Sequence, residues 1–110
     1  MIDDTIEKIQ QRLQQSPNLS SEKREELQAL IVQLKTEIAT LCKVDPDRAA
    51  SIAGLAETSA REATREDHQP ETTQNAIDEL ESSVTGFEAA HPKLTAVVNR
   101  IASTLSNLGI

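Results

Sequence analysis

Apolar residues recur along this chain at alternating spacings of three and four, which places them on one face of an α-helix. Near the N-terminus this register comprises Ile2, Ile6, Ile9 and Leu13, and in a second run it comprises Leu27, Ile31, Leu34, Ile38 and Leu41. Pro17 interrupts the pattern between the two runs, and Asp45-Pro46-Asp47 is typical of a helix start. We therefore expect helices over about residues 3–15, 20–43 and 46–64.

The third of these helices has mostly alanine on its apolar stripe. Small side chains allow helices to approach closely, but they bury little area. The segment that follows, residues 65–74, is polar and contains Pro70, so we expect a loop there.

The last third of the chain carries the strongest pattern. Its three-and-four spacing passes through Ile77, Leu80, Val84, Phe87, His91, Leu94, Val98, Ile101, Leu105 and Leu108. This predicts helices over about residues 71–90 and 92–108. Pro92 leaves two interpretations open, because it removes one backbone hydrogen bond: one kinked helix, or two helices that meet at His91-Pro92.

These patterns predict an all-α fold in one helical domain over residues 1–110, in which heptad-patterned helices form a coiled coil or a helical bundle. Only 26 of the 110 residues are Leu, Ile, Val or Phe, which is few for a core built by one chain. We therefore expect the core to be shared in a homo-oligomer, with a dimer as the first choice and a tetramer as the second. The predicted association seam consists of Ile77, Leu80, Val84, Phe87, Leu94, Val98, Ile101, Leu105 and Leu108.

Charge and composition exclude several classes of function. The net charge is −7, and the basic residues are not concentrated in a patch, which argues against nucleic acid and anionic membranes as partners. The chain has one Phe and no Trp or Tyr, so aromatic-lined ligand pockets are not expected. Cys42 is the only cysteine, and no stretch is apolar enough for a membrane span or a secretory signal. We expect a cytoplasmic protein.

Chemistry-bearing motifs are sparse. Glu88 and His91 lie three residues apart, and paired copies of this spacing can hold metal ions in four-helix bundles. His68 lies among acidic residues in the polar junction and is interpreted as a solvated surface histidine. No grouping suits nucleophilic catalysis, and no glycine-rich phosphate loop is present, so we expect no enzyme and no cofactor.

Two motifs carry a resemblance to a known family. The stretch Phe87-Glu88-Ala89-Ala90-His91-Pro92-Lys93-Leu94-Thr95 and the ending Leu105-Ser106-Asn107-Leu108-Gly109-Ile110 resemble a family of short bacterial helical proteins classified as a domain of unknown function. The resemblance is specific over residues 84–110. It implies a bacterial, cytoplasmic, helical protein. Some relatives carry a label that links them to chromosome-partitioning ATPases, but this chain has no Walker lysine motif.

Taken together, the sequence favours a non-enzymatic protein that acts by helical self-association or by interaction with another protein. One alternative is a metal-binding helical bundle that uses Glu88 and His91. The other is an acidic regulatory partner that offers residues 65–76 to a larger basic protein.

Overall fold

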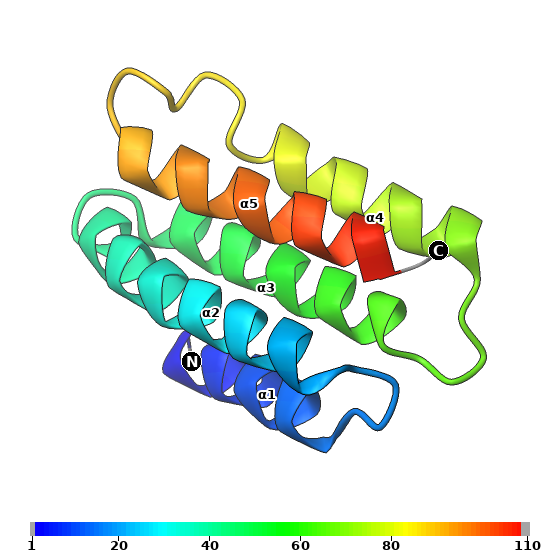
Figure 1. The fold of residues 1–110 in the computed structure, drawn as a ribbon. Coiled ribbons are helices and arrows are strands. Elements are labelled where there is room, and N and C mark those ends of the chain that lie inside the picture. Colours follow the sequence, from blue (N-terminus) through cyan, green and yellow to red (C-terminus); the bar gives the residue numbers. More distant parts are fainter. Residues whose placement is uncertain (1, 109–110) are drawn as a thin grey trace.

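The computed structural model describes residues 2–108, and within them the chain forms five α-helices and no strand (Figure 1). The helices are α1 (Ile2–Gln15), α2 (Ser21–Cys42), α3 (Pro46–Ala63), α4 (Pro70–Ser82) and α5 (Pro92–Leu108). The prediction of an all-α helical bundle is confirmed. The end of the C-terminal motif, Gly109 and Ile110, lies outside the described residues.

The residues at the helix starts explain why α2 and α3 begin where they do. The Ser20 hydroxyl accepts a hydrogen bond from the Lys23 backbone N–H at 3.2 Å, and the Asp45 carboxylate accepts one from the Arg48 N–H at 3.1 Å. Each satisfies an amide that has no partner within its own helix. Pro46 occupies the first turn of α3, where its missing N–H costs nothing.

One arginine closes the turn between α1 and α2. The Arg24 guanidinium donates hydrogen bonds to the backbone oxygens of Leu13, Ser16 and Leu19, at 3.0, 2.7 and 3.2 Å respectively. These oxygens belong to the end of α1 and to the turn that follows it, where no helical partner is available. A side chain of α2 therefore holds the end of α1.

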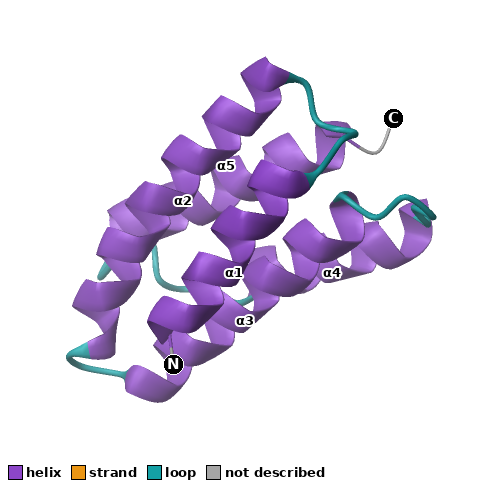
Figure 2. Cartoon of the chain, turned by 90° about the horizontal axis from the view of Figure 1, so that it is seen from below, coloured by secondary structure: helices purple, strands orange, loops and turns teal. Residues whose placement is uncertain are grey.

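The helices pack in two layers, and α3 lies in the middle of one of them. One layer contains α1, α3 and α4, with α3 in contact with both neighbours, and the other contains α2 and α5, which contact each other (Figures 1 and 2). In the second layer, α2 also contacts α1 and α3, and α5 also contacts α3 and α4. The inner face of α3 is lined by alanines that are almost fully buried, including Ala49, Ala53, Ala56 and Ala60. These small side chains allow α3 to contact all four of the other helices.

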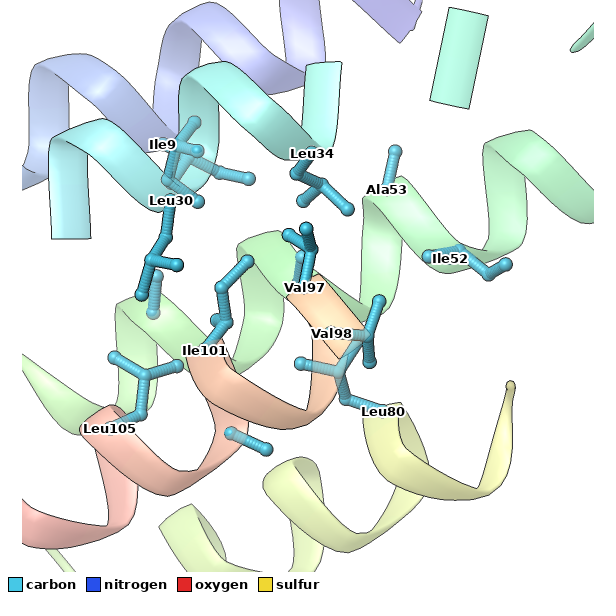
Figure 3. Packing of buried hydrophobic residues seen from close by; sticks show 14 of the residues in the cluster. Ile9, Leu30, Leu34, Ile52, Ala53, Leu80, Val97, Val98, Ile101 and Leu105 are labelled. Atoms are coloured by element: carbon cyan, nitrogen blue, oxygen red, sulfur yellow. The ribbon is translucent and has the colours of Figure 1, made fainter. Parts of the chain in front are cut away.

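The predicted association seam lies inside a single chain. Seven of its residues are 1% exposed or less, and these are Ile77, Leu80, Val84, Leu94, Val98, Ile101 and Leu105. The other two, Phe87 and Leu108, are partly buried against the same cluster. Figure 3 shows side chains of α5 meeting those of α2 and α3. This corrects the expectation that a second subunit is needed to shelter the aliphatic ridge, because α2, α3 and α4 of the same chain already cover it.

The segment before Pro92 also differs from its prediction. The expected helix over residues 71–90 ends at Ser82, and Gly86 adopts a left-handed backbone with φ of 90° that an α-helix does not permit. The chain then turns through hydrogen bonds from Phe87 N–H to the Val84 oxygen at 3.0 Å and from His91 N–H to the Phe87 oxygen at 2.7 Å. Since Pro92 is the first residue of α5, the two-helix interpretation is the one that holds.

Candidate protein-interaction site

A shallow groove of about 350 Å³ runs between α2 and α5 on the solvent side of the two-helix layer. We call it the α2–α5 groove. It is lined by Val32, Gln33, Thr36 and Glu37 of α2 and by Lys93, Ala96, Val97 and Arg100 of α5. Six of these residues are exposed, whereas Glu37 is half-buried and Val97 forms part of the floor.

The centre of the groove is apolar. Val32 is 55% exposed although it lies next to Ile31 in a helix whose main stripe is buried, because it falls outside that stripe. Val97, 7% exposed, and Ala96 face it from α5. Apart from Val32, the described residues contain one exposed large hydrophobic side chain, Val44, which follows α2 and lies outside the groove. A group of apolar side chains exposed together in a groove indicates a contact surface, whereas a single exposed aliphatic side chain on a flat surface does not.

The two helices of the groove run antiparallel, as the sequence colours in Figure 1 show. Their register follows from the Thr104 hydroxyl, which donates to the Glu26 carboxylate at 3.4 Å. Eleven residues separate Thr104 from Lys93 and eleven separate Glu26 from Glu37. Because both helices rise equally per residue, Lys93 lies across the groove from Glu37. Arg100 lies about 10 Å further along the groove, since seven residues rise about 1.5 Å each.

The charged side chains at the rim have no partners within residues 2–108. Glu37, Lys93 and Arg100 form neither an ion pair nor a side-chain hydrogen bond there. Lys93 and Arg100 are also the only charged residues of α5. The acidic excess lies elsewhere, for example on α4, whose charged residues are Glu71, Asp78, Glu79 and Glu81. The groove therefore combines both signs of charge around an apolar centre.

Glu88 and His91, the predicted metal pair, lie in the turn between α4 and α5 and not on a helix. The Glu88 carboxylate accepts a hydrogen bond from the Gly86 N–H at 3.1 Å. The His91 ring lies against the Phe87 ring with 5.7 Å between centroids, and the Arg48 guanidinium lies 5.4 Å from the Phe87 centroid. Within the described part of the chain, no three His, Cys, Asp or Glu side chains converge as metal ligands. The two residues thus shape the turn.

The acidic segment of residues 65–76 is partly fixed by its own ion pairs. Arg65 donates two hydrogen bonds of 3.0 Å to Asp67 and lies 3.4 Å from the Glu62 carboxylate. The hydrogen bond and the charge of Arg65 lower the pKa of Asp67. His68, predicted to be solvated, is half-buried, and its Nε2 is enclosed without a hydrogen-bond partner in the described residues. The prediction that the His68 ring is solvated is therefore wrong for its Nε2 atom.

Sequence reasoning missed the α2–α5 groove, although two signals pointed to it. Val32 is an apolar residue outside the buried stripe of α2, and Lys93 and Arg100 are seven residues apart, which places them on one side of α5. The predicted seam lies beneath the groove, in the core. No helix within residues 2–108 is both long and apolar enough to cross a membrane.

Comparison with protein families shows to which family most of the chain is similar. The family described as Domain of unknown function (DUF4404) matches residues 31–110, which include all eight residues of the groove and exclude α1. No curated protein and no solved structure matches the chain.

Proposed function

The chain belongs to the DUF4404 family, and we propose that it is a non-enzymatic protein that associates with a second copy of itself through the α2–α5 groove. The observation that supports this most is the exposed Val32 beside three rim charges, Glu37, Lys93 and Arg100, that have no partner within residues 2–108. A contact between identical surfaces requires a patch that complements itself. An apolar centre with both signs of charge at its rim meets that requirement.

The groove suits another helix better than a small molecule. Ligand sites are concave, enclose most of the ligand and are commonly lined by aromatic rings, whereas this groove is open and contains no aromatic residue. The space between two antiparallel helices can accept the ridge of a third helix. Thr36 and Ala96 are small enough to permit that approach.

The expected association is weak. Burying a whole Val side chain is worth about 1.5–3 kcal/mol, and since Val32 is about half exposed, each copy gains about 1 kcal/mol from it. Association must also overcome lost translational and rotational freedom of at least about 4 kcal/mol. The two Val32 side chains together do not offset this loss, so the other contacts of the groove must supply the difference. We therefore expect a weak dimer whose formation depends on the protein concentration.

The setting that we propose is the cytoplasm. Cys42 is the only cysteine, so the chain has no internal disulfide, which suits a reducing compartment. The two alternative functions have less support. Glu88 is already hydrogen-bonded within its turn, and Arg65 offsets part of the charge of the acidic segment.

Sedimentation velocity over a range of micromolar concentrations tests the proposal. We expect the wild-type protein to pass from monomer to dimer as its concentration rises, and the Val32→Glu variant to stay monomeric, because the substitution places a carboxylate at the apolar centre. Val44→Glu is the matched control, since it changes an exposed valine outside the groove and should leave the dimer intact. A wild-type protein that stays monomeric throughout, or a Val32→Glu variant that dimerises normally, would overturn the proposal.

A further inference from the structure

We propose that the dimer has its two-fold axis parallel to α2 and α5, so that α2 of each copy packs on α5 of its partner in an antiparallel four-helix arrangement. This inference rests on the proposed self-association and specifies its geometry. The distribution of charge along the α2–α5 groove is the observation that supports it.

Two layers that face each other can be related by a two-fold axis in the plane between them, and this axis can run along the helices or across them. An axis along the helices keeps the position of each residue along the groove and exchanges the two helices. Glu37 of one copy then faces Lys93 of the partner subunit, because these residues occupy the same position along the groove. The same contact occurs twice.

An axis across the helices places α5 on α5 in opposite directions. If it passes through the middle of the groove, between Ala96 and Val97, Lys93 of one copy faces Arg100 of the partner subunit, since the two residues are equally far from that point. Like charges then meet twice, and no cation lies directly opposite Glu37, because α2 faces α2. Like-charge contacts across an interface are strongly unfavourable, so the charges select the axis along the helices.

In the selected arrangement, the two Glu37 and two Lys93 side chains form a ring in which the signs alternate. Each carboxylate has one ammonium across its own groove and one on the partner subunit, which allows a charge network instead of an isolated surface pair. By the same register, Arg100 lies level with Leu30 of the partner subunit, in a part of α2 without charged residues. Neighbouring helices are antiparallel throughout, as in up-and-down four-helix bundles.

Charge reversal tests this geometry. Glu37→Lys makes the ring wholly positive and Lys93→Glu makes it wholly negative, so each single variant should raise the dimer dissociation constant at least about tenfold. The double variant restores the alternation and should return to within about threefold of the wild-type value. Glu79→Lys on α4 and Lys8→Glu on α1 are matched controls, because they change the net charge equally at exposed positions in the other layer and should have little effect.

The outcomes separate this inference from the proposed function. If wild type dimerises and Val32→Glu abolishes the dimer, but Lys93→Glu strengthens association, the axis runs across the helices and the inference is overturned while the function stands. The same conclusion follows if the double variant is no better than the single ones. If wild type does not dimerise at all, both fail. Thermal melting of every variant checks that its fold is intact, and Glu37→Gln with Lys93→Gln supplies milder changes if a reversal unfolds the chain.

Discussion

Replacing Ile101 by alanine tests whether the aliphatic ridge is the core of one chain. Ile101 is 1% exposed, and Figure 3 shows it on the side of α5 that faces α2, near Leu30. Ile→Ala removes three carbons and leaves a cavity among helices that are already close-packed, which costs about 2–5 kcal/mol. Small domains are stable by about 5–15 kcal/mol in total, so this single change removes a large part of the margin.

The expected result is a lower melting temperature that does not depend on protein concentration. For a chain of this size, each kcal/mol lowers the melting temperature by about 4 °C, so Ile101→Ala should lower it by about 8–20 °C. Circular dichroism at 222 nm measures the transition. The Val32→Glu background removes association through the groove, and within it the melting temperature should be the same over about a hundredfold dilution, because a core built by one chain does not dissociate.

Val44→Ala is the control for this experiment. Val44 is 73% exposed, so losing its methyl groups should change the free energy of unfolding by no more than about 0.5 kcal/mol. Two results would refute the reasoning. One is an Ile101→Ala variant that melts within about 2 °C of its parent. The other is a melting temperature that falls steadily on dilution in the Val32→Glu background, which is the behaviour of a core shared between subunits.

Three further predictions follow from the described residues. Gly86→Ala should lower the free energy of unfolding by about 1 kcal/mol or more because of its left-handed backbone, whereas Gly54→Ala, within α3, should raise it by up to about 1 kcal/mol; urea unfolding measures both. Arg65 lowers the pKa of Asp67 below 3.8, so the pair stabilises the folded state above pH 3.8, and this stabilisation is lost as the pH falls through the pKa of the folded state. An NMR titration that finds the Asp67 pKa at or above 3.8 would contradict this prediction. Asp45→Ala removes the cap of α3 and should cost about 1 kcal/mol in urea unfolding, whereas Asp45→Asn should retain most of the stability.

The sequence predicted best those features that depend on contacts between residues close together in the chain, such as helix caps. Ser20 and Asp45 cap the helices that follow them, and the expected starts of α2 and α3 lie within a residue of the observed ones. The segment of residues 83–91 was misread because Val84 and Phe87 still point to the core and so preserve the three-and-four spacing. Periodicity records which side chains are buried and not the path of the backbone between them.

The sequence did not predict which helices pack against each other or in what register. Whether the ridge of α5 meets its own chain or another depends on α2 and α4 folding back across an alanine-lined α3. This depends on contacts between residues far apart in sequence. The α2–α5 groove has the same origin, because Glu37 and Lys93 become neighbours through a register that only the packed bundle defines.

The hydrogen bonds of Arg24 join the end of α1, and the turn that follows it, to α2. A planar guanidinium can serve three oxygens in one geometry, which the compact ammonium of a lysine cannot reproduce. These hydrogen bonds add to the contacts that Ile6, Ile9 and Leu13 of α1 make in the core, where each is 1% exposed. The helix α1 is therefore fixed to the bundle both along its buried face, which packs on α2 and α3, and at its C-terminal end.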